Sequence, residues 1–304
     1  MIRLGLLGVN TSHADAFSRI LNGDGETPAA IKGASITAIW GQDAARVNEL
    51  AGRHRIKHMV EEPDDLLGEV DGVLVVDDTD GGALHASLAR PFLEAGLPVF
   101  VDKPMTTTYE DAVGLFELAA RTGAPLLSCS ALRFAAELEP ARAELERIGR
   151  LSSVVSVGPG DWYYYGVHAV ELLAAVTGTG AVSVYRHAFD QRDLAVIPFA
   201  DGPVAVVETL RDAAYVFELT AYGEHGHTSF TVTDHAAFYT NTMREVVRMI
   251  ERGRSPLRPE ETLEVLAILQ AGERSGNSGQ AITLDAVRRD SDRRPEHAPA
   301  PQSR

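Results

Sequence analysis

The sequence has little of what marks secreted, membrane and nucleic-acid-binding proteins. A single cysteine, Cys129, excludes an internal disulfide framework and suits a reducing cytoplasm. No apolar run approaches the roughly 18 residues of a membrane span, and residues 1–10 are typical of a first strand, not of a signal peptide. Basic residues number 28 against 43 acidic ones, so the net charge of −15 argues against nucleic acid as a partner.

Residues 1–128 alternate strand-like and helix-like segments. The chain of 304 residues has the length of roughly two domains, and 45% hydrophobic residues are enough for their cores. The alternation predicts an α/β domain with a Rossmann-like, doubly wound parallel sheet. Its expected strands are 2–9, 35–40, 70–78, 97–103 and 124–129, and its expected helices are 12–22, 43–53, 83–95 and 106–123.

Residues 129–288 have a different pattern, in which strand-like runs are joined by short turns. This pattern predicts an α+β domain with an open, mainly antiparallel sheet. Its expected strands lie near 181–188, 194–199, 203–211, 215–222 and 226–232, and its expected helices near 134–148, 166–176, 235–252 and 259–275. Residues 289–304 are polar and contain proline, which predicts a disordered tail.

The turn after the first strand has the context of a dinucleotide-binding fingerprint, a glycine-rich loop between a strand and a helix. In "GVNTSH", 8–13, the three glycine positions hold Gly8, Asn10 and His13. Gly8 can form the tight turn, Asn10 can offer its amide to a phosphate, and His13 replaces a glycine that allows close helix packing. With Thr11 or Ser12 as N-cap, the free N–H groups of the helix form an anion site. The alternative is an ordinary turn between strand and helix.

The acid that usually binds the cofactor ribose is missing. By analogy with related sequences, its position at the end of the second strand holds Gly41. The repulsion of a 2′-phosphate is thereby removed, so both NAD and NADP stay open as cofactors. Asp43, two residues later, is interpreted as a helix cap.

The segment "VFVDKPM", 99–105, ends an apolar strand in two charges and a proline. Asp102 and Lys103 place both signs of charge at the strand end, and Pro104 prevents the strand from continuing. Open α/β sheets bind ligands at such strand ends. The segment alone allows two interpretations, a ligand site or a solvated turn with a surface ion pair.

Five segments, in their order and spacing, resemble those of one known family. "AGLPVFVDKPMTTTYEDA" is similar to that family's a-G-k-x-V-x-x-E-K-P segment with Asp102 for the glutamate, and "YGVHAVELL" is similar to its G-x-H-x-x-D segment. The other three are "LHASLARPFLEAG", "AYGEHG" and "ERSGNSGQAITL". Over residues 1 to about 284, the chain resembles the glucose–fructose oxidoreductase and inositol dehydrogenase family, Gfo/Idh/MocA.

The resemblance implies an NAD- or NADP-dependent oxidoreductase that acts on CH–OH groups of a sugar, a cyclitol or a related polyol. Residues 1–128 are then the dinucleotide-binding domain, and 129–288 serve substrate binding and oligomerisation. The departures from the family pattern leave two alternatives, a lyase or epimerase that retains its cofactor and a non-catalytic ligand-binding protein. Fold alone does not decide among the three.

The resemblance also implies roles for the residues at the strand end. In such relatives the lysine lies beside the nicotinamide and the substrate, where the ammonium of Lys103 hydrogen-bonds the reacting oxygen and favours its more anionic form. Asp102 is expected to orient the lysine or hold nearby backbone, and Pro104 to fix the turn. The expected cofactor-binding residues are Gly8, Asn10, Thr11, Ser12, His13, Gly41, Asp102, Lys103 and Pro104.

The second catalytic stretch implied by the resemblance is "DWYYYGVHAVELL", 161–173. His168 matches the family's histidine and suits proton transfer. The family's aspartate, four residues earlier, is replaced by Tyr164, which can donate or shuttle a proton but carries no charge near pH 7. Trp162, Tyr163 and Tyr165 either stack on a sugar ring or pack the domain interface.

Other polar residues have two interpretations each. Arg133 binds a substrate carboxylate or a backbone carbonyl, and Glu171 orients His168 or caps another segment. His85 lies either near the nicotinamide or on a surface helix. The "HGH" at 225–227 lacks a third ligand, so no metal is expected.

Self-association is expected through the second sheet. "VAVVETL" and "YVFELTAY" carry apolar residues at many consecutive positions, whereas a sheet with one solvated face alternates more cleanly. An identical subunit is the simplest cover for the extra apolar face. These observations predict a cytoplasmic homodimer or homotetramer that binds a small-molecule substrate and neither membrane nor nucleic acid.

Overall fold

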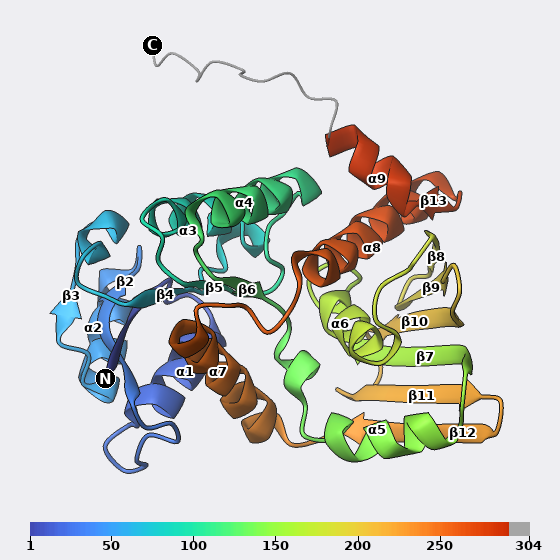
Figure 1. The fold of residues 1–304 in the computed structure, drawn as a ribbon, viewed down its shortest axis with the longest axis horizontal. Coiled ribbons are helices and arrows are strands. Elements are labelled where there is room, and N and C mark those ends of the chain that lie inside the picture. The colour runs from blue at the N-terminus through green and yellow to red at the C-terminus, as the bar shows by residue number, and fades with distance from the viewer. Residues whose placement is uncertain (292–304) are drawn as a thin grey trace.

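The computed structural model describes residues 1–291, which form two sheets with helices packed around them (Figure 1). The first sheet has six parallel strands in the order β3-β2-β1-β4-β5-β6. They are β1 (Ile2–Leu7), β2 (Ala34–Trp40), β3 (His58–Met59), β4 (Gly72–Val75), β5 (Val99–Val101) and β6 (Leu126–Ser128). The Rossmann-like, doubly wound sheet predicted from the sequence is confirmed.

Helices cover both faces of this first sheet. They are α1 (Ser12–Asn22), α2 (Ala44–His54), α3 (His85–Glu94) and α4 (Tyr109–Thr122). Leu4, Leu74 and Phe100 are buried in one core with α1 and α2, whereas Val73 and Val99 are buried in the other with α3 and α4. Because both faces are covered, the strands read as continuous apolar runs.

Three of these helices begin at side chains that the sequence marks as caps. Thr11 Oγ1 accepts the His13 N–H at 3.3 Å, Asp43 caps α2, and Thr108 caps α4. Each cap satisfies N–H groups that the helix itself leaves free. The carboxyl ends of β1, β4 and β5 therefore open onto helix starts and loops at one edge of the sheet, where ligands of such folds bind.

The second sheet has seven strands in the order β12-β11-β7-β10-β9-β8-β13. They are β7 (Leu151–Pro159), β8 (Ser183–Ala188), β9 (Arg192–Pro198), β10 (Val204–Leu210), β11 (Phe217–Gly223), β12 (Gly226–Val232) and β13 (Ile282–Thr283). Neighbouring strands are antiparallel except β7 and β10, which are parallel. The open, mainly antiparallel sheet is confirmed.

Three strands, β3, β7 and β13, were not predicted from the sequence. β7 reads "LSSVVSVGP", and its serines, glycine and proline are poor strand formers. It nevertheless lies inside the sheet, where pairing with β10 and β11 decides its conformation. Ser156 of β7 is fully buried and donates to the Ala169 carbonyl at 2.8 Å. β3 is too short, at two residues, to give a sequence pattern.

The remaining helices divide between the two sheets. They are α5 (Leu138–Arg147), α6 (Gly166–Thr177), α7 (His235–Arg252), α8 (Pro259–Ser278) and α9 (Leu284–Ser291). α6 and α8 pack on one face of the second sheet, whereas α7 returns to the first sheet beside α1 (Figure 1). There Met243, Val246 and Met249 share a core with Phe17. The part of the molecule built around the first sheet is thus completed by a helix from the C-terminal part of the chain.

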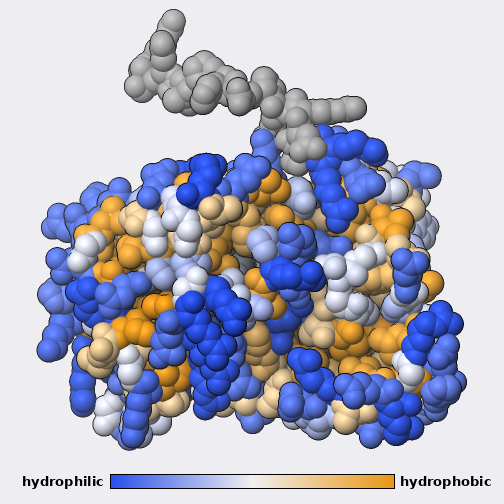
Figure 2. Space-filling view, in the orientation of Figure 1, coloured by the Kyte–Doolittle hydropathy of each residue, from blue (hydrophilic) through white to orange (hydrophobic). Residues whose placement is uncertain are grey.

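The predicted tail, 289–304, overlaps the end of the described residues. α9 runs to Ser291, so positions 289–291 are helical, and the rest of that prediction lies outside the described residues. Hydrophilic side chains cover most of the face seen in Figure 2, with smaller hydrophobic patches between them. None of the described helices combines the length and apolar character that crossing a membrane requires.

Candidate active site

A cavity of about 100 Å³ lies at the carboxyl edge of the first sheet, where residues of both domains meet. The turn at 11–13 and Lys103 line it from the first domain, and residues of α6, β11 and α7 line it from the other side. The three residues predicted as catalytic, Lys103, Tyr164 and His168, all line this cavity. The fold thus brings Lys103 next to Tyr164 and His168, which follow it by 61 and 65 positions in the sequence.

Lys103 follows β5 directly and is buried, with 7% of its surface exposed. Its Nζ lies 3.8 Å from the ring centroid of Tyr164, a cation–π contact. Burial lowers the pKa of Lys103, while the charges of Asp102 and Asp78 act in the opposite direction. No carboxylate among the described residues forms an ion pair with Nζ. The interpretation of "VFVDKPM" as a solvated turn with a surface ion pair is therefore wrong, and the N–H donors of Lys103 stay available to a ligand.

His168 reaches the cavity from the first turn of α6. Its Nδ1 lies 2.7 Å from Ser130 Oγ, and that oxygen also accepts the Leu132 N–H at 3.2 Å. This contact fixes the ring orientation and leaves Nε2 without a hydrogen-bond partner among the described residues. Burial, together with the nearby Lys103, lowers the pKa of His168 well below its ordinary value. A neutral imidazole held in this way can accept a proton.

Tyr164 connects the second domain to the first. Its hydroxyl donates to Asp78 Oδ2 at 2.6 Å, and Asp78 follows β4 at the same edge of the sheet as Lys103. Asn10 Oδ1 accepts the Asp78 N–H at 2.8 Å, and its Nδ2 donates to Thr79 Oγ1 at 3.1 Å. Burial and the Asp78 contact raise the pKa of Tyr164, so the phenol stays protonated. The amide of Asn10, expected to meet a phosphate, thus holds the loop that presents Asp78.

His13 points away from the glycine turn and into the protein. Its Nδ1 lies 2.6 Å from Asp102 Oδ2, and its Nε2 lies 3.0 Å from the Tyr239 hydroxyl of α7. Burial works against the charge of Asp102, but His13 outweighs it and lowers the pKa of that carboxyl to about 2. Asp102 is therefore the hydrogen-bond partner of His13, and this pairing was not predicted from the sequence.

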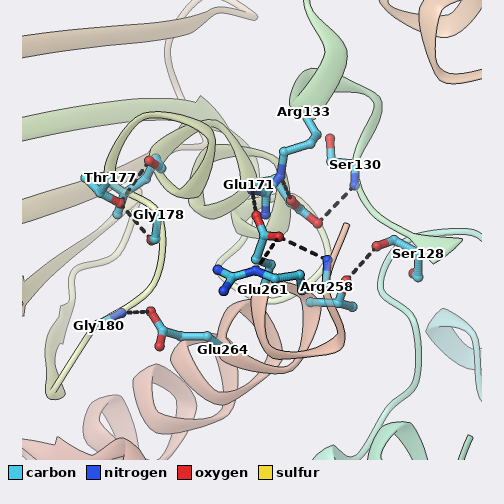
Figure 3. Close-up of polar contacts among 12 residues, drawn as sticks. Ser128, Ser130, Arg133, Glu171, Thr177, Gly178, Gly180, Arg258, Glu261 and Glu264 are labelled. Atoms are coloured by element: carbon cyan, nitrogen blue, oxygen red, sulfur yellow. Dashed lines mark hydrogen bonds and ion pairs between the residues drawn. The ribbon is translucent and has the colours of Figure 1, made fainter. Parts of the chain in front are cut away.

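The Arg133 side chain does not reach the cavity, which corrects its assignment as a substrate-binding residue. Its Nε donates to Glu171 Oε2 at 2.7 Å, and both side chains are almost fully buried (Figure 3). Glu171 Oε1 accepts the Ser130 N–H at 3.2 Å. Of the two interpretations of Glu171, capping of another segment is the one observed. The pair stabilises the segment that presents Ser130 to His168.

The aromatic residues before α6 separate into packing and lining residues. Trp162 is 2% exposed, and its indole N–H donates to the Leu269 carbonyl at 2.8 Å, so it packs the interior and is not a substrate ligand. The Tyr163 hydroxyl lies 3.2 Å from the carbonyl oxygens of Thr106 and Thr107, which makes it a contact between the domains. Only Tyr165 of the three lines the cavity.

The glycine turn has the shape that a dinucleotide needs. Gly8 has φ +105°, and a Cβ there would lie 2.4 Å from the Asp77 backbone nitrogen, so only glycine fits. Thr11 and Ser12 begin α1 beside this turn and expose the helix start. At Gly41 a Cβ would lie 2.5 Å from the Val9 side chain, so packing explains why no acid stands at the ribose position.

Several site residues were missed by the sequence reasoning. Asp78 and Ser130 follow β4 and β6 as Asp102 follows β5, so the rule that ligands bind at strand ends was a signal for both. Tyr239 gave no signal. His85 is buried in α3, where its Nδ1 lies 3.0 Å from the Pro104 carbonyl oxygen and supports the loop after Lys103. Within residues 1–291, no cluster of His, Cys, Asp or Glu is arranged to hold a metal.

Comparisons with known proteins agree with this geometry. Residues 2–129 match the model of an oxidoreductase family with an NAD-binding Rossmann fold, GFO_IDH_MocA. The first part of the chain is thus similar to the Gfo/Idh/MocA family. The chain is 25% identical over 247 residues to inositol 2-dehydrogenase 2 of Saccharopolyspora erythraea, which covers 74% of this chain and 68% of that protein. It is 30% identical over 132 residues to inositol 2-dehydrogenase of Rhodococcus erythropolis, but there the match spans 43% of this chain and only 36% of the relative.

Solved structures extend the likeness in fold to the second domain. Scyllo-inositol dehydrogenase from Lactobacillus casei, with bound NAD(H) and scyllo-inositol, superposes with a TM-score of 0.83 over 94% of this chain and 99% of that chain, at 15% identity. A myo-inositol dehydrogenase from Corynebacterium glutamicum gives a TM-score of 0.78 over 93% of this chain and 99% of that chain, at 16% identity. The match to the family model and the inositol 2-dehydrogenase relatives support an oxidoreductase with an NAD(P)-binding domain.

Proposed function

We propose that this protein is an NAD- or NADP-dependent dehydrogenase that oxidises a secondary hydroxyl of a neutral polyol, a cyclitol or a sugar. The observation that carries the proposal is a buried lysine without a carboxylate partner that shares one cavity with a half-buried, neutral histidine. Both lie at the carboxyl edge of an NAD-binding sheet. The described residues and the comparisons offer no support for the lyase, epimerase or sensor alternatives.

Lys103 and His168 divide the chemistry at the substrate. The Lys103 N–H groups donate to the reacting oxygen and stabilise the negative charge that develops there as the hydroxyl proton leaves. His168 accepts that proton at Nε2, while Ser130 holds Nδ1. A bound NAD or NADP supplies the hydride acceptor. In the reverse direction His168 returns the proton to the carbonyl oxygen.

Tyr164 stands at the position of the family's aspartate and binds a carboxylate of the first domain. Its ring covers the Lys103 ammonium, and its hydroxyl lies on Asp78. The family has its aspartate in the second domain, whereas here the carboxylate is that of Asp78, which follows β4 in the first domain. The Tyr164 hydroxyl connects this carboxylate to the second domain. Tyr164 orients Lys103 and leaves the proton transfer to His168.

The charges around the cavity favour a substrate without a carboxylate. Among the described residues that line the cavity, Lys103 is the only lysine or arginine. Arg133, which could have bound an acid group, is occupied by Glu171. One cation suffices for the reacting oxygen of a neutral polyol but leaves none to neutralise a substrate carboxylate. Tyr165 and Tyr215 provide apolar ring faces for the carbon skeleton.

The residues of the first domain fit a dinucleotide. Gly8 allows the close backbone approach, and the start of α1 at Thr11 and Ser12 offers N–H groups to the pyrophosphate. The loop with Lys103 and Pro104 would hold the nicotinamide end of such a cofactor. The absence of a side chain at Gly41 admits both NAD and NADP.

Substrate oxidation tests this proposal directly. Purified protein is mixed with NAD⁺ or NADP⁺ and myo-inositol, scyllo-inositol, glucose or glucuronate, and reduced nicotinamide is followed by its absorbance. Turnover of at least one neutral polyol, and a much lower kcat/KM for glucuronate than for glucose, is expected. Failure of both cofactors to bind at millimolar concentration in a calorimeter, or equal turnover of glucose and glucuronate, would overturn the proposal.

We also propose that the open face of the second sheet joins two copies in a homodimer or homotetramer. A row of mostly apolar side chains crosses the sheet on this face in register: Thr220, Val155, Val206, Val196 and Tyr185. Tyr185 is 43% exposed, and the three valines are only half-buried. No described helix covers this face (Figure 1). An identical row related by a two-fold axis would bury it.

Light scattering measures the mass of the assembly. A dimer or tetramer is expected at micromolar concentration, and Val206→Glu should convert it to monomers because it places a charge at the centre of the row. A monomer mass for the unaltered protein would refute this arrangement. A cytoplasmic location is proposed with it, since the lone Cys129 is a buried free thiol.

A further inference from the structure

His13 occupies the third glycine position of the dinucleotide turn, yet its ring belongs to the catalytic centre. The side chain is buried and lies 5.1 Å, centroid to centroid, from the Tyr239 ring, at an interplanar angle of 68°. The Phe17 ring of α1 lies 5.3 Å from the His13 ring and 5.9 Å from the Tyr239 ring, centroid to centroid. These rings hold the imidazole in one orientation, between the first domain and α7.

Both ring nitrogens of His13 are occupied by protein atoms. Nδ1 lies on Asp102 Oδ2 at 2.6 Å and Nε2 on the Tyr239 hydroxyl at 3.0 Å. Because no nitrogen is left for a ligand, His13 cannot exchange a proton directly with a substrate. His168, with Nε2 unpartnered among the described residues, is the histidine that can. The role of His13 must therefore act through Asp102 or Tyr239.

Asp102 is the closest point of influence on catalysis, because it immediately precedes Lys103. Its carboxylate is 6% exposed, and His13 is the only side chain among the described residues that hydrogen-bonds it. A buried carboxylate without a partner strongly favours any cation within reach. The nearest available cation would be the Lys103 ammonium.

We propose that His13 is a positioning residue that engages the Asp102 carboxylate and so keeps the Lys103 ammonium free of an ion pair and available to a substrate oxygen. The inference rests on the proposed function for the role of Lys103, but the arrangement of the three residues is independent of it. Tyr239 supports the ring from α7 and completes the arrangement.

The charge balance around Lys103 sets the expected direction of change. Asp102, Asp78 and Asp161 each favour the protonated amine, whereas burial disfavours it. Tyr164, just before α6, covers the amine, and the neutral His168 of α6 faces the same cavity. Removal of the His13 ring leaves the Asp102 carboxylate without its side-chain partner. That carboxylate then acts more strongly on the neighbouring amine and raises the pKa of Lys103.

Competitive labelling with acetic anhydride measures this pKa without any need for turnover. Only the neutral amine reacts, and the sequence has three lysines, Lys32, Lys57 and Lys103, whose peptides mass spectrometry can separate. Lys32 and Lys57 are exposed and serve as internal references. In the unaltered protein, the labelling midpoint of Lys103 is expected below those of Lys32 and Lys57.

The variants isolate the contribution of His13. His13→Ala should raise the Lys103 midpoint by about one pH unit, the low end of what a charge within about 6 Å produces. His13→Gln retains an N–H donor for Asp102 and should shift it less. Tyr239→Phe, the matched control, removes the other partner of the ring and should leave the midpoint near its original value.

A double variant decides whether the effect passes through Asp102. Asp102→Asn should lower the Lys103 midpoint, and His13→Ala in that background should add little, because the carboxylate is gone. An unchanged midpoint in both folded His13 variants, or an equal shift with and without Asp102, would overturn the proposal. If no polyol is oxidised, the proposed function is wrong, but the labelling experiment still tests the role of His13 because it needs no turnover.

Discussion

Replacement of Tyr164 by phenylalanine tests the departure that most separates this chain from the family that it resembles. The substitution keeps the ring over the Lys103 ammonium and removes only the hydroxyl that donates to Asp78 Oδ2 at 2.6 Å. A hydrogen bond to an ionised acceptor contributes about 1.5–3 kcal/mol. Tyr164 is only partly buried, so water can replace some of this contact, and the lower end of the range applies.

A loss of about 1.4 kcal/mol in the transition state corresponds to a tenfold fall in kcat/KM, and the upper end of the range to about a hundredfold. The dependence of kcat/KM on pH should also change. With its donor gone, Asp78 acts more strongly on Lys103 and raises the pKa of that amine, so the alkaline limb of kcat/KM moves to higher pH.

The assay is kcat/KM for the best polyol from pH 5 to pH 10, for Tyr164→Phe and two matched controls. Tyr165→Phe removes a hydroxyl from the same cavity, and Tyr163→Phe removes one that contacts the backbone carbonyls of Thr106 and Thr107. Both controls should stay within about threefold of the unaltered enzyme. If the Tyr164→Phe profile superimposes on that of the unaltered enzyme, Tyr164 is only an aromatic wall, and the reasoning about Asp78 is wrong.

Three further changes test other parts of the site. Lys103→Ala should lower kcat by at least about a hundredfold, while calorimetry should still detect dinucleotide binding. The control Lys57→Ala changes an exposed lysine and should leave kcat unchanged. If Lys103→Ala retained more than about a tenth of the original kcat, the role of Lys103 would be structural. Gly8→Ala forces a Cβ to within 2.4 Å of backbone at φ +105°, so thermal unfolding should occur at lower temperature and dinucleotide binding should weaken, and an unchanged melting temperature would contradict the turn geometry. Because the fold lowers the pKa of His168, the unfolded chain binds a proton below about pH 6.5 that the folded chain does not. The free energy of unfolding should therefore fall as the pH drops through about 6.5, and denaturant titrations should show a smaller fall for His168→Gln. Equal falls in both proteins would contradict a neutral His168 ring in the folded state.

Local patterns in the sequence were sufficient for most of the first domain and for the two central site residues. Thr11, Asp43 and Thr108 cap helices where the sequence places them, because capping depends on a side chain and the next three residues. Lys103 and His168 could be identified because the segments that resemble the family, 99–105 and 161–173, are short and continuous in the sequence.

The partners of the site residues were decided only by the tertiary structure. His13 and Asp102 are 89 positions apart, Tyr164 and Asp78 are 86 apart, and His13 and Tyr239 are 226 apart. A sequence shows that a polar group exists, but which partner it binds depends on which donors and acceptors the fold buries together. Arg133 is the example: its sequence position suited a substrate carboxylate, but burial beside Glu171 gave it a partner within the protein. The fold likewise places β7 inside the second sheet and α7 on the first, because long-range pairing and packing outweigh weak local propensity.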